Sequence, residues 1–95
     1  MLPEKKVENK IKNYLIGLNG YLIKTIGGSV PAGTPDIIAC VNGIFVGIEV
    51  KKPKGGVVSE LQKHHIKMIE HAGGVAFVAK SVEEVKENLQ RHYII

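Results

Sequence analysis

The chain has 95 residues, 44% hydrophobic and 23% charged, which excludes a disordered polypeptide and predicts one globular domain over residues 1–95. Thirteen basic residues against nine acidic ones give a net charge of +4, which favours polyanionic partners. Cys40 is the only cysteine, so an intramolecular disulfide is excluded and a reducing, cytoplasmic location is expected. Cys40 itself is expected to be a small core residue. No apolar run approaches the roughly 20 residues that span a bilayer, and no signal peptide is recognisable, so no membrane partner is expected.

The first third of the chain predicts a helix, a short strand and a loop. Residues 3–19 form the helix, with apolar side chains at helical spacing on one stripe: Val7, Ile11, Leu15 and Leu18. Residues 21–26 read as a strand. Residues 27–35 hold three glycines and two prolines, which is typical of a loop.

Two β-rich runs follow, residues 36–41 and 44–51, and Asn42-Gly43 between them is a strong hairpin signal. The next predicted helix begins at Ser59, where Gln62 completes a capping box, and ends near Ala72.

Residues 75–79 then read as a buried strand. A second capping box, Ser81 with Glu84, opens a last helix that ends near His92. The element order is therefore helix, three strands, helix, strand, helix. It predicts an α/β (α+β) fold with a mixed central sheet flanked by helices.

The hairpin places two carboxylates together. If Asn42-Gly43 is a two-residue loop, Val41 pairs with Ile44, and the same register sets Asp36 opposite Glu49, with Cβ atoms ~5 Å apart. Lys51 lies on the same face, beyond Glu49, and Gly47 leaves room there. The other face is expected to be apolar throughout: Ile37, Ala39, Val41, Ile44, Val46, Ile48 and Val50.

Directly opposed carboxylates repel each other unless a positive group lies between them. Hard oxygen ligands of this kind suit Mg²⁺ or Mn²⁺. The Lys51 ammonium can orient a water molecule or stabilise phosphate charge. Asp36, Glu49 and Lys51 are therefore the predicted catalytic centre, although a strand start after Pro35 and a solvated face would also explain these residue types.

The spacing resembles the PD-(D/E)XK nuclease superfamily and, more narrowly, the VRR-NUC family of virus-type replication-repair nucleases, in a stand-alone, phage-type form. Three segments carry the resemblance: Gly33-Thr34-Pro35-Asp36, Glu49-Val50-Lys51-Lys52-Pro53 and Ser59-Glu60-Leu61-Gln62. It implies a metal held by Asp36, Glu49 and the carbonyl of Val50, with Glu8 as a further carboxylate and Gln62 in support. A helical charge ladder would also explain Glu8, and the capping box alone would explain Gln62.

A basic cluster follows the predicted centre in sequence and is expected to contact DNA phosphates, unless it is a plain solvated face: Lys52, Lys54, Lys63, His64 and Lys67. The low aromatic content disfavours base stacking and favours recognition of a duplex backbone or junction shape. The sequence therefore predicts a structure-selective endonuclease acting on branched DNA, such as four-way (Holliday) junctions or flaps.

Two alternatives stay open, a non-catalytic DNA-binding module on the same fold and a phosphate-cradling domain built on the Gly-Gly pairs. A homodimer is expected, because two matched cuts in a four-way junction require two sites related by two-fold symmetry. The family resemblance implies the same assembly. The apolar end Tyr93-Ile94-Ile95 must pack on the chain's own core or on a partner.

Overall fold

The computed structural model describes residues 2–95. The elements follow the predicted order: α1 (Pro3–Gly17), β1 (Tyr21–Lys24), β2 (Ile37–Val41), β3 (Ile44–Val50), α2 (Glu60–His71), β4 (Val75–Ala79) and α3 (Val82–Arg91). Each predicted element is present, and the boundaries differ from the prediction by at most two residues.

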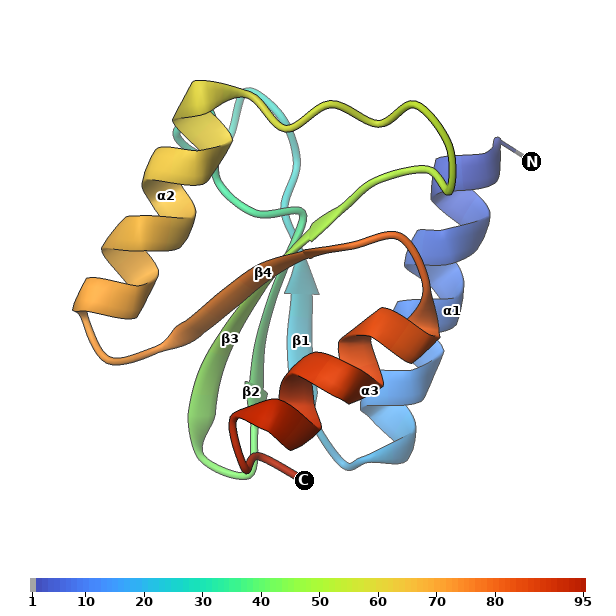
Figure 1. The fold of residues 1–95 in the computed structure, drawn as a ribbon, viewed down its shortest axis with the longest axis vertical. Coiled ribbons are helices and arrows are strands. Elements are labelled where there is room, and N and C mark those ends of the chain that lie inside the picture. Colours follow the sequence, from blue (N-terminus) through green and yellow to red (C-terminus); the bar gives the residue numbers. More distant parts are fainter. Residues whose placement is uncertain (1) are drawn as a thin grey trace.

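The four strands form one mixed sheet in the order β1-β2-β3-β4. β1, β2 and β3 are antiparallel neighbours, and β4 runs parallel to β3 because α2 carries the chain back to the start of the sheet. Helices α1 and α3 cover one face of the sheet and α2 packs on the other (Figure 1). No helix within residues 2–95 is long and apolar enough to cross a membrane.

The β2–β3 hairpin has the predicted register, from Val41↔Ile44 at the turn to Ile37↔Ile48. Asn42 and Gly43 both have positive φ, 50° and 82°, as a tight two-residue turn requires. The predicted apolar face is buried against α1 and α3, except that Ile44 beside the turn is 37% exposed. Ile94 is buried in the same core, so the chain's own core accounts for the packing of that residue.

The α2 side of the sheet differs from the prediction at two positions. A Cβ on Gly47 would lie 2.9 Å from Ile69 Cδ1 and 3.1 Å from Pro35 Cγ, so this glycine admits close packing of α2 and leaves no room beside the site. Cys40, which we expected in the core, is exposed, since α2 packs on β3 and β4.

Side chains cap both later helices. Ser59 and Gln62 form the complete capping box of α2. At α3, the Ser81 side chain accepts from the Glu84 N–H as predicted, but Glu84 Oε1 accepts from the N–H of Lys80, at 2.7 Å, instead of Ser81. The second predicted capping box is therefore only half formed, and the glutamate anchors the end of the preceding strand.

Candidate metal centre

Asp36 lies at one end of the sheet, where β2 begins. It occupies the bend before Ile37, and its backbone carbonyl accepts a hydrogen bond of 2.8 Å from the N–H of Thr25. Its side chain turns across the strand end, and Oδ2 accepts a 2.8 Å hydrogen bond from the N–H of Val50. Asp36 therefore lies one residue beyond the last pair of the β2–β3 ladder, Ile37↔Ile48, so the predicted pairing of Asp36 with Glu49 is not part of the sheet. Its carboxylate is nevertheless fixed beside Val50 and Glu49.

Glu49 is buried, with 3% of its surface exposed. Its Oε2 accepts a hydrogen bond from Gln62, whereas Oε1 is buried without a hydrogen-bond partner among the described residues. Burial raises the pKa of Glu49 to about 8, and the neighbouring Asp36 carboxylate adds to the effect, against the opposing charge of Lys51. At neutral pH the metal-free carboxylate is therefore mostly protonated, and a bound cation would remove the need for that proton.

Lys51 follows at the end of β3. Its Nζ lies 3.8 Å from Glu49 Oε2, and its side chain is only 14% exposed. Gly56 packs directly on its stem, since a Cβ there would lie 2.8 Å from Lys51 Cβ. The loop between β3 and α2 thus covers the lysine stem and keeps the ammonium close to the carboxylates.

The Gln62 side chain makes two hydrogen bonds, one within the helix cap and one to Glu49. The side-chain Oε1 accepts from the N–H of Ser59, at 2.9 Å, and so completes the capping box of α2. The Nε2 of the same amide donates to Glu49 Oε2, at 3.0 Å. The first turn of α2 is therefore tied directly to the buried carboxylate.

Glu8 lies on α1, on the face of the sheet opposite to α2, and is 5% exposed. Three lysines surround its carboxylate: Lys5 at 2.9 Å, Lys12 at 3.6 Å and Lys24 at 3.1 Å. Although burial opposes the effect, hydrogen bonds from Lys5 and Lys24 lower the pKa of Glu8, so it stays ionised. The helical charge ladder expected around Glu8 is present, and it converges on a buried group.

Lys24 was not identified from the sequence. Its Nζ lies 3.1 Å from Glu8 Oε1 and 3.7 Å from Asp36 Oδ1, so it bridges the two carboxylates. It pairs with Ile37, the residue that follows Asp36, but the sequence contains no turn signal that would reveal the β1–β2 register. That register depends on the long loop between the two strands.

The residues suit a hard divalent cation in part. Within residues 2–95, no three Asp, Glu, His or Cys side chains lie together closely enough to hold a metal ion. Asp36 and Glu49 supply two carboxylates. Glu49 Oε1 is buried without a hydrogen-bond donor among the described residues, and a bound cation would supply the missing partner. The Val50 N–H points toward Asp36, and in an extended strand the carbonyl of the same residue faces the same side, as a third oxygen.

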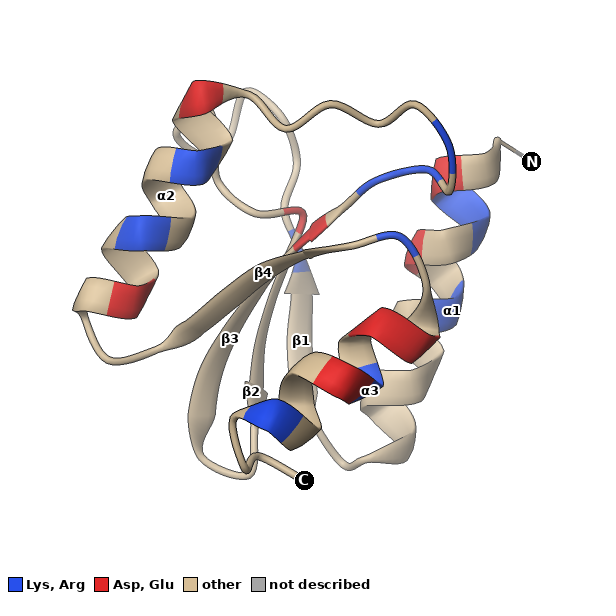
Figure 2. Cartoon of the chain, in the orientation of Figure 1, with Lys and Arg blue, Asp and Glu red and all other residues tan. Residues whose placement is uncertain are grey.

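The predicted basic cluster is exposed but divided. Lys52 and Lys54 lie in the β3–α2 loop, near the start of α1, where Pro53 lines a hollow of about 200 Å³ together with Lys10 and Lys80. The other three, Lys63, His64 and Lys67, lie on α2. Figure 2 shows basic residues on both sides of the sheet end that carries the acidic pair. The residues that cluster in the sequence thus lie on two separate surfaces, one on each side of the centre. The lysines of α1 extend the surface formed by the β3–α2 loop.

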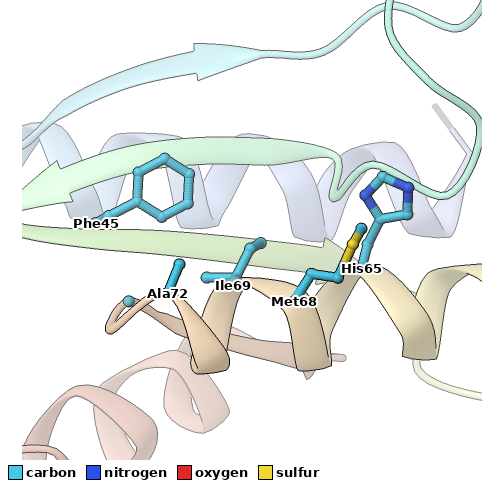
Figure 3. Close-up of a pocket in the computed structure, with 6 residues that line it drawn as sticks. Phe45, His65, Met68, Ile69 and Ala72 are labelled. Atoms are coloured by element: carbon cyan, nitrogen blue, oxygen red, sulfur yellow. The ribbon is translucent and has the colours of Figure 1, made fainter.

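Another hollow lies away from the centre. A pocket of about 410 Å³ lies between α2 and the sheet, lined by Phe45, His65, Met68, Ile69, Ala72 and Gly74 (Figure 3). It includes none of the candidate metal or catalytic residues. A hollow of about 350 Å³ beside the centre is lined by Lys24, Asp36 and the loop before Asp36.

Two solved structures have the same fold. One, described as a VRR_NUC domain, covers 98% of this chain and 99% of its own length, with a TM-score of 0.80 and 24% sequence identity. The other, described as a VRR_NUC domain protein, covers 96% of this chain and 88% of its own, with a TM-score of 0.73 and 24% identity. No family model and no curated protein matches the sequence. The chain therefore has the VRR-NUC domain fold, as the sequence motifs predicted.

Proposed function

We propose that this protein is a Mg²⁺- or Mn²⁺-dependent endodeoxyribonuclease that hydrolyses phosphodiester bonds. The observation that carries the proposal is the buried Glu49 beside Asp36, two carboxylates in contact at one end of the sheet with one buried oxygen lacking a donor. Burying such a pair costs stability, which argues for a function that needs it. The shared fold with VRR_NUC domains supports a nuclease in particular.

Asp36, Glu49 and the carbonyl of Val50 would hold the metal, which would polarise the scissile phosphate and lower the pKa of a bound water. Gln62 orients Glu49 through its 3.0 Å hydrogen bond. Lys51 orients the attacking water or stabilises charge on the phosphate, since its ammonium lies beside Glu49 and its side chain is largely buried. Glu8 would add a carboxylate on the α1 side, directly or through water.

Branched DNA, a four-way junction or a flap, is the substrate that we propose. Basic residues flank the carboxylate pair on both sides, in the β3–α2 loop with α1 and on α2 (Figure 2). Such a distribution suits a backbone that passes the centre on both sides, because lysine contacts to phosphate carry affinity without reading sequence. The proposed basic contacts are Lys52, Lys54, Lys63, His64 and Lys67.

We propose further that the protein acts as a homodimer. The α2 side of the sheet leaves apolar side chains uncovered toward the β1 edge, with Tyr21 73%, Ile23 55% and Phe45 46% exposed. The register joins them across the strands through Tyr21↔Cys40 and Cys40↔Phe45, so they form one continuous surface. An exposed apolar surface of this kind suits burial in a two-fold dimer.

The dimer is tested by sedimentation velocity at micromolar concentration. We expect a species of twice the 10.3 kDa chain mass for the wild type. Ile23→Asp should give the monomer, whereas Val57→Asp, at a loop position that is 80% exposed, should leave the dimer intact. A clean monomer for the wild type would refute the assembly, and an unchanged dimer for Ile23→Asp would refute the surface.

Catalysis is tested with end-labelled duplex, flap and four-way junction, each with and without Mn²⁺. The proposal requires metal-dependent cleavage of a branched substrate, and Glu49→Gln should remove it. The non-catalytic DNA-binding module, the alternative on the same fold, predicts binding to these substrates with no cleavage in any metal. If flaps are cleaved but four-way junctions stay uncut, the nuclease proposal stands and junction resolution is refuted.

A further inference from the structure

Lys24 occupies the space between the two halves of the candidate centre. Its ammonium lies 3.1 Å from Glu8 Oε1 and 3.7 Å from Asp36 Oδ1, and its side chain is 35% exposed. Lys5 and Lys12 also contact Glu8, but among the ion pairs of residues 2–95, only that of Lys24 reaches Asp36. Lys24 is therefore the cation that joins the α1 carboxylate to the carboxylate of the sheet.

The backbone fixes this position. Lys24 pairs with Ile37 at the end of β1, on the sheet face that α1 covers, so its side chain rises toward Glu8. The next residue, Thr25, holds the turn before β2 with hydrogen bonds from its N–H and its hydroxyl to the carbonyl of Asp36, and from the hydroxyl to that of Pro35. The pairing of β1 with β2 thus holds the Lys24 ammonium beside the carboxylates.

We propose that Lys24 is a positioning residue that sets the metal affinity of the centre: its ammonium holds Glu8 and Asp36 in the metal-free protein and is displaced from Asp36 when a divalent cation binds. This rests on the proposed function. Two positive charges cannot both occupy the oxygen face of one carboxylate without strong repulsion. The hollow of about 350 Å³ lined by Lys24 and Asp36 gives the displaced ammonium space to move.

The arrangement also accounts for the missing ligand cluster. Within residues 2–95, no three acidic, histidine or cysteine side chains group closely enough for a metal, although Glu8 and Asp36 are both bonded to one lysine. The ammonium keeps them on either side of itself. When the ammonium leaves Asp36, Glu8 can approach the other two carboxylates. The lost interaction between Lys24 and Asp36 makes the free energy of metal binding less favourable by the same amount.

This predicts two effects of opposite sign for Lys24→Met. The metal-free variant should unfold at a lower temperature, because two carboxylates lose their shared cation. Its dissociation constant for Mn²⁺ should fall roughly three- to tenfold, the range that a half-buried ion pair supports. A lysine with a merely structural function would give the opposite second result, since a disordered site binds metal more weakly.

The experiment is isothermal titration of Mn²⁺ into the DNA-free protein at one pH, with thermal unfolding of each variant with and without Mn²⁺. Lys12→Met is the matched control, because it removes a Glu8 partner that does not contact Asp36. It should change the Mn²⁺ affinity less than twofold. Lys24→Gln serves as a second variant, so that the result does not depend on how one replacement side chain packs.

Tighter Mn²⁺ binding by both folded Lys24 variants, with Lys12→Met near the wild type, is the expected result. Unchanged or weaker binding by folded Lys24 variants overturns the inference and leaves the proposed metal centre standing. An equal gain in affinity for Lys12→Met also overturns it, because net charge alone would then be the cause. A wild-type protein that binds no Mn²⁺ overturns the proposed metal centre itself.

Discussion

Replacing Glu49 by glutamine should stabilise the metal-free protein and abolish its response to metal. Glutamine has the shape of a protonated glutamate, can donate to Asp36 through its amide, and can still accept from Gln62. The substitution therefore keeps the contacts of the protonated state and removes the ionisation. The wild type, in contrast, must hold a proton on Glu49 that the unfolded chain releases at neutral pH.

The magnitude follows from the pKa of Glu49, which burial and Asp36 raise from 4.5 to about 8. The folded state binds this proton more tightly than the unfolded state. The contribution of the proton to the free energy of unfolding is therefore complete below pH 4.5 and is lost as the pH rises toward 8. Each pH unit is worth about 1.4 kcal/mol, so the loss between pH 4.5 and pH 7 has an upper limit of about 3.5 kcal/mol. For a domain of this size that corresponds to more than about 10 °C in Tm.

Thermal unfolding of metal-free protein, in a chelator, between pH 5 and pH 8 measures this directly. The wild-type Tm should fall across the range, whereas Glu49→Gln should remain nearly constant and exceed the wild type at pH 7. Adding Mn²⁺ should then stabilise the wild type, by about 2.7 kcal/mol at a hundred times its dissociation constant, and leave the variant unchanged.

Glu60→Gln is the control, because that side chain is 92% exposed and pairs only with Lys63 among the ion pairs of residues 2–95. It removes the same charge and should alter the metal-free stability by less than about 0.5 kcal/mol at any of these pH values. A wild-type Tm that does not vary between pH 5 and 8 would refute the argument for a raised pKa. Equal stabilisation of Glu49→Gln by Mn²⁺ would show that Glu49 is not a metal ligand.

Three further substitutions separate chemistry from packing. Lys51→Met should reduce the cleavage rate by roughly a hundredfold or more, with DNA affinity measured by fluorescence anisotropy changed only a few-fold. Gln62→Ala should cost about 2 kcal/mol in denaturant unfolding, more than Ser59→Ala, because it removes the cap bond and the bond to the buried carboxylate; equal losses would contradict this. Gly47→Ala should destabilise by about 1–3 kcal/mol through displacement of α2, whereas Gly17→Ala, which meets open space, should not destabilise.

The sequence by itself determined the elements and the contacts between residues that are close along the chain. Asn42-Gly43 allows few turn geometries, so the register of β2 and β3 and the meeting of Asp36 with Glu49 could be predicted from residue spacing. Helix starts followed from Ser59 and Ser81 for the same reason, since a cap bond closes within three residues.

Only the tertiary structure decided which distant side chains complete the centre. Lys24 reaches Asp36 because a long loop returns β2 beside β1, and α1 brings Glu8 to the same ammonium. The second bond of the Gln62 amide exists because α2 packs across the sheet, which Gly47 permits. These contacts depend on how layers fit together, and close packing of whole side chains leaves no periodic signature in the sequence.

The same limit explains why Cys40, predicted in the core, is exposed, and why Ile44 is partly exposed on a face that is otherwise buried. Alternation along a strand assigns Cys40 and Ile44 to faces of the sheet but does not say how far each face is covered. Cys40 is exposed, and Ile44 is 37% exposed. Sequence periodicity fixes the direction of a side chain, whereas the length and placement of the covering helix fix its burial.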